Sequence, residues 1–128
     1  ELLRQRLYDN TAADAAVGST ISVKQLDEML AERERGERDL VLIDVREQNE
    51  WEIVSIPGAV LIPKGEFLNG KALEQLPSDK QIVLHCKVGG RSAEALAVVK
   101  GAGYSDAIHV GGGIVAWVNQ LHPELPVY

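Results

Sequence analysis

The sequence predicts an α/β domain built on a central parallel sheet of about five strands, with helices on both faces. Two observations carry this prediction: short, continuous apolar runs recur along the chain, and segments with helical periodicity separate them. Apolar runs of this kind are typical of strands buried on both faces, and such strands alternate with helices in parallel sheets. The length of 128 residues fits one domain with a core of useful size.

The expected elements follow one another in order. Ser22 and Gln25 form a capping box at the start of a helix that Gly36 is expected to end. Further helices are expected at 49–53, 91–101 and 114–121, with a helical turn near 71–76. Strands are expected near Ile21 and at 40–45, 59–62, 81–85 and 107–110.

The first part of the chain has a different composition. Residues 10–20 are small and polar and show no hydrophobic pattern, which is typical of a linker. The chain also begins with Glu1 rather than Met. We therefore expect residues 1–20 to be a linker from an upstream domain and residues 21–128 to form the folded domain.

Composition excludes several classes of function. Nineteen acidic against thirteen basic residues give a net charge of −6, and no basic cluster suggests nucleic-acid binding. No apolar run approaches the roughly 20 residues of a membrane span, and no signal segment opens the chain, so we expect a cytoplasmic protein without membrane contact. The single cysteine, Cys86, excludes an intrachain disulfide, and its spacing from the histidines gives no metal site.

Cys86 follows a predicted buried strand, and the residues after it are typical of an anion-binding loop. Gly89 and Gly90 allow the backbone conformations of a tight turn, and a helix is expected to begin near Arg91. Backbone N–H groups that turn inward ahead of a helix, together with the helix dipole, favour a thiolate. Arg91 and Lys87 add positive charge. The sequence therefore predicts a nucleophilic cysteine that accepts or holds an anionic species.

The same residues allow other interpretations. A lone cysteine after an apolar strand is often only a small buried side chain. Cys86 and Arg91 enclose four residues, whereas cysteine phosphatases enclose five to wrap a phosphoryl group. The smaller ring fits a single sulfur atom better. A small cysteine phosphatase or arsenate reductase-like enzyme, and a non-catalytic binding module, remain the alternatives.

Five segments, taken in order, resemble the rhodanese family of sulfurtransferases. They are residues 42–51 (LIDVREQNEW), 56–59 (IPGA), 86–92 (CKVGGRS), 101–104 (GAGY) and 111–117 (GGGIVAW). Val54 and Ser55 stand where the family often has Gly-His, which we expect to change local packing and to leave catalysis unaffected. The resemblance implies a rhodanese-like fold over residues 21–128.

The resemblance also implies an activity, that of a thiosulfate sulfurtransferase with a persulfide intermediate. Cys86 is expected to attack the sulfane sulfur of a donor, either a small anion such as thiosulfate or the persulfide of a donor protein, and to pass it to a nucleophilic acceptor. Arg91 is the second expected catalytic residue. The expected substrate-binding loop residues are Lys87, Val88, Gly89, Gly90 and Ser92. No metal or organic cofactor is implied.

Two charged residues follow the strand at 40–45. We expect Asp44 to brace the neighbouring loop by accepting hydrogen bonds from the backbone or from Arg46. Arg46 has two interpretations, as a partner of Asp44 or as a second contact to the anionic substrate. We therefore count it among the candidate substrate-binding residues.

A narrower resemblance concerns partners. Residues 86–96 (CKVGGRSAEAL) and 112–117 (GGIVAW) are similar to the C-terminal rhodanese domains of bacterial adenylyltransferases that activate ubiquitin-like sulfur carriers. Such fusions serve molybdopterin, thiamine or cysteine-forming pathways. This resemblance implies an upstream adenylyltransferase domain and a sulfur-carrier protein as partners.

The three histidines and the glycine run are expected to be structural. His85 precedes Cys86 in a strand, where neighbouring side chains point in different directions, so packing is a better interpretation than base catalysis. His109, in a predicted strand, and His122, beside a proline, are also expected to be structural. Residues 111–113 lack the frame of a phosphate loop, and we expect a tight turn there.

Overall fold

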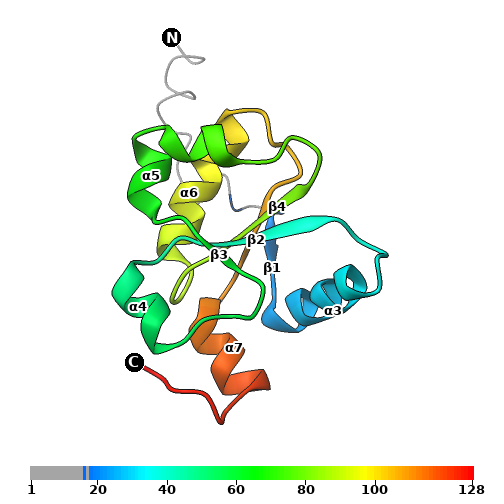
Figure 1. Cartoon of the computed structure of the whole chain (residues 1–128), viewed down its shortest axis with the longest axis vertical. Coiled ribbons are helices and arrows are strands. Elements are labelled where there is room, and N and C mark those ends of the chain that lie inside the picture. The colour runs from blue at the N-terminus through cyan, green and yellow to red at the C-terminus, as the bar shows by residue number, and fades with distance from the viewer. Residues whose placement is uncertain (1–15, 17) are drawn as a thin grey trace.

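A five-stranded parallel sheet lies at the centre of the structure, a computed structural model that describes Ala16 and residues 18–128 (Figure 1). The strands are β1 (Thr20–Ile21), β2 (Leu40–Asp44), β3 (Val60–Leu61), β4 (Gln81–His85) and β5 (Ile108–Val110). The helices are α3 (Val23–Glu34), α4 (Gln48–Ile53), α5 (Lys64–Leu68), the 3₁₀-helix η1 (Lys71–Gln75), α6 (Gly90–Gly101) and α7 (Gly113–Leu121). The predicted α/β class and the predicted parallel sheet are confirmed.

The strand order is β1-β5-β4-β2-β3, and every neighbouring pair is parallel. β2 and β4 pair along their whole length, so that Asp44 lies opposite His85. Both strands therefore end at the same level. The residues that follow them, including Cys86, meet at the carboxyl edge of the sheet, where parallel α/β folds place their ligand sites.

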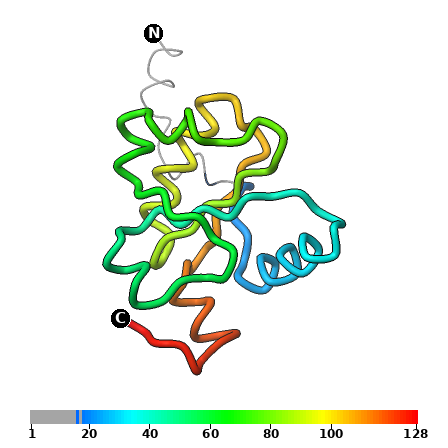
Figure 2. Tube along the Cα trace, viewed as in Figure 1, coloured from blue at the N-terminus to red at the C-terminus, as the bar shows by residue number. Residues whose placement is uncertain are grey.

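Two hydrophobic layers cover the sheet. On one face, Val23 and Leu26 of α3 pack with Trp117 of α7 against the strands. On the other face, Phe67 of α5 packs with Leu96 and neighbouring residues of α6. In Figure 2 the segments of α5 and α6 lie above the strands and those of α3 and α7 lie below them. The alternation of strand side chains explains this division, since successive residues of a strand point to opposite faces.

The first described helix begins and ends as predicted. The Gln25 amide donates to Ser22 Oγ at 3.1 Å, and the Ser22 amide donates to Gln25 Oε1 at 2.8 Å. These two bonds complete the capping box. Gly36, with a φ of +74°, adopts the left-handed conformation just after the helix, which a glycine accepts without steric cost.

Two details differ from the predictions. Helix α5 was not expected, because the sequence KGEFL is short, follows a proline and contains Gly65. The sheet also begins one residue earlier than expected, because Thr20 pairs with His109 in β1. Ser19, also part of the predicted linker, is buried, and its carbonyl accepts from the His109 amide. Residues 1–15 and 17 of the predicted linker lie outside the described residues.

The predicted turn at residues 111–113 is confirmed, and it touches the Cys86 loop. Gly112 and Gly113 have φ values of +80° and +56°. The first free amides of α7 then point at the loop: the Ile114 amide donates to the Cys86 carbonyl at 2.9 Å, and the Val115 amide donates to the Lys87 carbonyl at 3.1 Å. This close approach leaves no space for a side chain at Gly113, where a Cβ would collide with both carbonyl groups.

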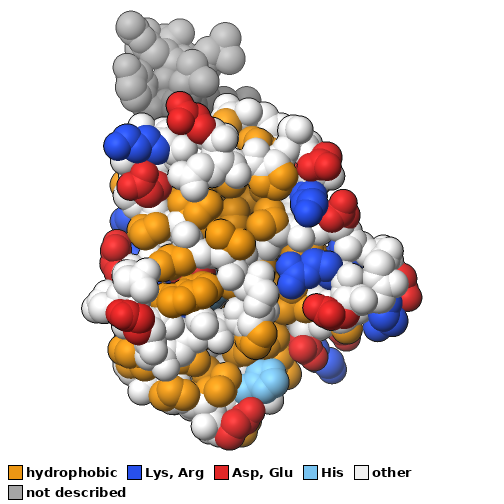
Figure 3. Space-filling view, viewed as in Figure 1, with side chains coloured by type: hydrophobic (Ala, Val, Ile, Leu, Met, Phe, Trp, Pro, Cys, Tyr) orange, Lys and Arg blue, Asp and Glu red, His pale blue; other side chains and the backbone are white. Residues whose placement is uncertain are grey.

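The outer surface carries scattered charges. Figure 3 shows acidic and basic side chains spread around the rim of one face, with hydrophobic side chains between them. Among the described helices, none combines the length and the apolar character needed to cross a membrane.

Replacing Gly113 by Ala tests the contact between α7 and the loop. We expect the free energy of unfolding to fall by about 2 kcal/mol or more, because alanine is strained at a positive φ and its Cβ meets two carbonyl groups. Urea unfolding followed by circular dichroism measures the change. Gly101→Ala is the matched control: Gly101 lies in α6 with open space at its Cβ position, so stability should change by about 1 kcal/mol or less. Equal stability of the two variants would contradict the account.

Candidate active site

Cys86 lies directly after β4, at the carboxyl edge of the sheet. Its side chain packs in the same hydrophobic layer as Ile82 and Leu84, on the α6 side of the sheet. Only 1% of its surface is exposed. The alternation along β4 therefore delivers the sulfur to the space in front of α6.

The loop after Cys86 wraps around its sulfur. Gly89 has a φ of +124° and is the N-cap residue of α6. Its amide donates a hydrogen bond to Cys86 Sγ at 3.1 Å. Gly90, Arg91 and Ser92 form the first turn of α6, and the amides of a first helical turn have no acceptor within the helix. The sulfur thus faces N–H donors at the positive end of a twelve-residue helix.

Arg91 is held by a carboxylate from another helix. Its two terminal nitrogens donate to Glu50 Oε1 and Oε2 at 2.6 and 3.0 Å, and Tyr128 donates its hydroxyl proton to Glu50 Oε2 at 2.7 Å. The hydrogen bond from Arg91 is the main reason that the pKa of Glu50 falls to about 2. The bidentate pair ties the start of α6 to α4.

The position of Arg91 refines the role expected for it. No hydrogen bond joins Arg91 to Cys86 among the described residues, because the guanidinium faces Glu50. The pKa of Arg91 is raised, first by the hydrogen bond to Glu50 and also by the charges of Glu50 and Cys86. The guanidinium therefore stands near the sulfur without a hydrogen bond to it, and the Glu50 carboxylate balances its charge.

The substrate contact considered for Arg46 does not fit the structure. Arg46 is completely buried and forms a bidentate ion pair with Asp44. Its Nε donates to Asp44 Oδ1 at 3.0 Å, and its Nη2 donates to Asp44 Oδ2 at 2.7 Å. Its remaining N–H groups donate to the carbonyls of Glu50 and Val54 and to the Tyr128 hydroxyl. Every donor of Arg46 is thus engaged. The geometry favours the bracing role for Arg46 together with Asp44.

Lys87 and Val88 lie at the outer side of the loop. The Lys87 ammonium stands 4.3 Å from the centre of the Tyr128 ring, in a cation–π contact. Val88 is 62% exposed, an unusual value for a large apolar side chain. The loop thus presents one exposed apolar side chain, Val88, and one ammonium group that lies over the Tyr128 ring.

His85 is buried beside the loop, as the expectation of a packing role requires. Its Nδ1 lies 3.2 Å from the carbonyl oxygen of Cys86, and its Nε2 lies 3.7 Å from Asp44 Oδ2. Burial lowers the pKa of His85. The ring faces the carboxylate and the backbone, and the sulfur of Cys86 is not among its hydrogen-bond partners.

Three site residues were missed from the sequence: Glu50, Tyr128 and His109. Glu50 stands within the segment at 42–51 that carries the family resemblance, which was a usable signal. Tyr128 and His109 had none, because the residues that they contact lie 78 and 17 positions away. The His109 ring lies 2.8 Å from Ser92 Oγ, which in turn lies 3.5 Å from Cys86 Sγ.

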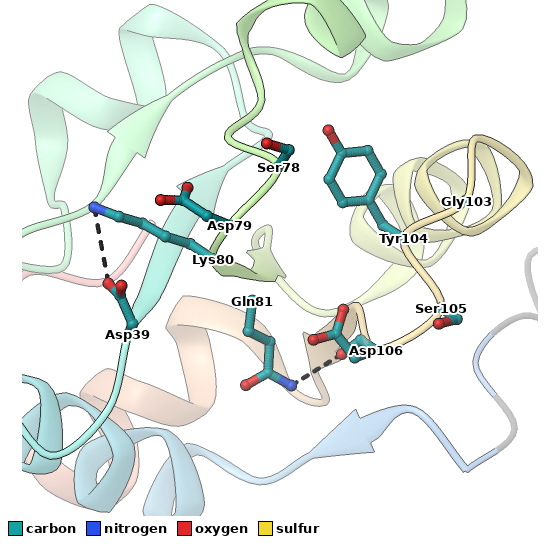
Figure 4. A pocket seen from close by; sticks show the side chains of 9 residues that line it. All are labelled: Asp39, Ser78, Asp79, Lys80, Gln81, Gly103, Tyr104, Ser105 and Asp106. Atoms are coloured by element: carbon teal, nitrogen blue, oxygen red, sulfur yellow. Dashed lines mark hydrogen bonds and ion pairs between the residues drawn. The ribbon is translucent and has the colours of Figure 1, made fainter.

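A separate hollow of about 380 Å³ opens at the opposite edge of the sheet (Figure 4). Its lining comes from the segments that precede β2, β4 and β5, among them Asp39, Lys80 and Asp106. Lys80 Nζ and Asp39 Oδ1 lie 3.8 Å apart. The side-chain amide of Gln81 donates from Nε2 to the backbone carbonyl of Asp106 at 2.9 Å. Lys80 and Asp39 are thus paired with each other, and none of the residues that line the hollow belongs to the Cys86 loop. We assign it no role.

The fold and the site together define a class: parallel α/β domains that present one buried cysteine to the N-terminus of a helix. The family model described as "Rhodanese-like domain" matches residues 22–120. The chain therefore belongs to the rhodanese-like family, as the sequence resemblance implied.

Individual relatives agree with this membership. The chain is 54% identical over 117 residues to "Probable adenylyltransferase/sulfurtransferase MoeZ" of Mycobacterium tuberculosis, which covers 91% of this chain and 29% of that protein. It is 32% identical over 102 residues to a "Sulfurtransferase" of Allochromatium vinosum, and the match covers 79% of this chain and 94% of that protein. Among solved structures, the reduced CoADR-RHD of Bacillus anthracis superposes with a TM-score of 0.71 at 34% identity, covering 86% of this chain and 18% of that one. The chain thus spans less than a third of the MoeZ relatives that it matches.

The ion pair between Glu50 and Arg91 predicts a pH dependence of stability. The folded pKa of Glu50, about 2, lies below its ordinary value of 4.5. Its contribution is therefore complete above the unfolded pKa and is lost as the pH falls toward the folded pKa. The wild type should therefore have a larger free energy of unfolding than Glu50→Gln, and this difference should be greatest above about pH 5. On acidification the difference should shrink, by at most about 3 kcal/mol.

Urea unfolding of both proteins at a series of pH values measures this difference. In an Arg91→Ala background the same Glu50→Gln substitution should have a smaller effect, because the main partner of the carboxylate is gone. A difference between wild type and Glu50→Gln that stays constant on acidification would contradict the assignment.

Proposed function

We propose that the domain is a sulfurtransferase that carries sulfane sulfur as a persulfide on Cys86. The observation that carries the proposal is the hydrogen bond of 3.1 Å from the Gly89 amide to Cys86 Sγ, in a loop that closes onto the first turn of α6. Four residues separate Cys86 from Arg91, a ring sized for one sulfur atom. Membership of the rhodanese-like family and similarity to proteins named as sulfurtransferases support the same activity.

The first half-reaction is a displacement at sulfur. The Cys86 thiolate attacks the sulfane sulfur of thiosulfate, a sulfur–sulfur bond forms at Cys86, and sulfite leaves with the electrons of the broken bond. The outer sulfur then carries the negative charge, and the amides of Gly90–Ser92 are its expected donors. Lys87 favours an anionic donor through its charge, and Arg91 does so less because its guanidinium is paired with Glu50.

The second half-reaction reverses the roles. A nucleophilic acceptor attacks the outer sulfur, and the Cys86 thiolate leaves and is regenerated. Because Cys86 is almost completely buried in its loop, we expect only slender acceptors to reach its sulfur. Cyanide is the simplest acceptor of this kind.

Cys86→Ser tests the nucleophile. We expect sulfur transfer from thiosulfate to cyanide to fall by at least about 1,000-fold, because an oxygen cannot carry the persulfide. Intact-mass measurement after thiosulfate treatment should show one added sulfur atom on the wild type and none on the variant. Unchanged circular dichroism serves as the folding control.

Two results would overturn the proposal. One is a Cys86→Ser variant that transfers sulfur as fast as the wild type. The other is hydrolysis of an aryl phosphate by the wild type, with loss in Cys86→Ser and no sulfur transfer by either protein. The second result would favour the cysteine phosphatase alternative.

We further propose that the acceptor is the C-terminus of a ubiquitin-like sulfur carrier, activated by an adenylyltransferase domain of the same protein. The similarity to MoeZ, of which this chain spans 29%, supports this proposal. A flexible Gly-Gly tail is slender enough for the loop. Its adenylated carboxylate is attacked by the persulfide sulfur, AMP leaves, and a thiol reductant cleaves the acyl disulfide to release the thiocarboxylate.

The carrier proposal predicts a strict requirement. The domain alone should convert thiosulfate and cyanide, but it should form a thiocarboxylate on a carrier only with an adenylyltransferase, ATP and dithiothreitol present. Mass spectrometry of the carrier C-terminus detects the product, and reactions without ATP or with Cys86→Ser are the controls. A carrier that gains no sulfur when all components are present and Cys86 is persulfidated would overturn the carrier proposal and leave the sulfurtransferase proposal standing.

A further inference from the structure

We propose that His109, acting through the hydroxyl of Ser92, accepts the proton that Cys86 loses when it becomes the nucleophile. The inference deepens the proposed function and rests on Cys86 as the attacking group. His109 touches no reacting atom, so it is a positioning residue that acts on the sulfur only through Ser92.

A continuous hydrogen-bonded chain leads away from the sulfur. Cys86 Sγ lies 3.5 Å from Ser92 Oγ, a distance within the range of a thiol donor. Ser92 Oγ lies 2.8 Å from His109 Nδ1, and His109 Nε2 lies 3.1 Å from Thr20 Oγ1. Three elements supply these residues, since Ser92 lies in α6, His109 in β5 and Thr20 in β1.

The direction of the chain follows from its far end. Thr20 donates its single hydroxyl proton to the carbonyl of Ala16 at 3.0 Å, and a carbonyl can only accept. With the Thr20 proton on that carbonyl, Thr20 Oγ1 is free to accept from His109, and we assign the ring proton to Nε2 on this basis. A neutral imidazole then has a free lone pair on Nδ1. That lone pair faces Ser92.

Ser92 completes the link to the sulfur. Its hydroxyl proton has two possible acceptors, His109 Nδ1 at 2.8 Å and the Gly89 carbonyl at 3.2 Å. The shorter bond goes to His109. When the Ser92 proton lies on that bond, the lone pairs of Ser92 Oγ remain free to accept from the thiol of Cys86.

The surroundings of His109 keep its ring neutral. The side chain is 5% exposed, and burial lowers its pKa. Its neighbours are hydroxyls, Thr20 from β1 and Ser92 from α6, while the thiol of Cys86, just after β4, reaches it through Ser92. No charged side chain of the described residues adds to the pKa shift. The free Nδ1 of the neutral ring, 2.8 Å from Ser92 Oγ, is therefore placed to accept a proton, and the thiolate formed on Cys86 offsets the charge that the ring gains.

The proton transfer balances without any further reactant. The thiol proton moves to Ser92 Oγ while the Ser92 hydroxyl proton moves to His109 Nδ1. The products are a thiolate and an imidazolium, and the Gly89 amide already donates to the sulfur that gains the charge. After the attack, the proton returns along the same chain when the thiolate is regenerated and protonated.

Alkylation of Cys86 by iodoacetamide tests the inference, because it requires a deprotonated sulfur but no sulfur donor. His109→Asn keeps an amide that can accept from Ser92 but cannot take up a proton. We expect alkylation of this variant near neutral pH to be at least about tenfold slower than that of the wild type. The rate should recover as the pH is raised, because hydroxide then replaces the base.

Two further variants make the result decisive. Ser92→Ala breaks the chain at its middle and should slow alkylation to a similar extent, with no additional loss in the double variant. His122→Asn is the matched control, because His122 is paired with Glu124 at the surface. In this variant, the rate of Cys86 alkylation should equal that of the wild type. Circular dichroism confirms that each variant is folded.

His109→Asn and Ser92→Ala variants that alkylate at the wild-type rate, with an unchanged pH profile, would overturn the inference. A failure of the proposed function looks different. If the wild type transferred no sulfur but His109→Asn still slowed alkylation, the proton chain would stand and the sulfurtransferase proposal would fall.

Discussion

The site depends on two hydrogen bonds that hold the Cys86 loop from outside. The carbonyls of Cys86 and Lys87 accept from the first free amides of α7, those of Ile114 and Val115. In a planar trans peptide the N–H points opposite to the C=O, so the next two amides of the loop point away from α7. The Gly89 amide continues this turn and reaches the sulfur at 3.1 Å. The loop therefore lies between two helix N-termini: α7 fixes its carbonyls, and α6 presents donors to the cysteine. Gly113 makes this arrangement possible, because a side chain there would push the loop away.

Charged residues support the loop without entering it. Arg46 is buried with all of its donors engaged, and it joins the end of β2 to the carbonyl of Val54 and to Tyr128. Glu50 receives both Arg91 and Tyr128. The side chains of Arg46, Glu50 and Tyr128 thus form one hydrogen-bonded network, which holds Arg91 at the start of α6. Such fully partnered networks fix geometry more than they add stability, because burying charge is costly. Here the network fixes where α6 begins relative to the sulfur.

The sequence predicts the sheet, its parallel direction and the loop, because these rest on local patterns: apolar runs, a cysteine at a strand end and two glycines before a helix. Contacts between distant segments are not encoded locally. Glu50 meets Arg91 across 41 positions, and no spacing rule links them. Arg46 kept two interpretations, because its burial depends on how residues 50–54 and Tyr128 close over it. Helix α5 was missed because a segment of five residues with an internal glycine has no periodic signal. His109 had the pattern of a core residue, and only the pairing of β5 with β1 and β4 places it behind Ser92.

The proposed role of the loop is to hold one sulfur atom on Cys86. A crystal structure of the protein after thiosulfate treatment tests this claim most directly. The account predicts an additional sulfur atom bonded to Cys86 Sγ and lying within hydrogen-bond distance of the amides at the start of α6, with the contacts between α7 and the loop unchanged. An unmodified Cys86, or an added sulfur that points away from those amides, would contradict the account.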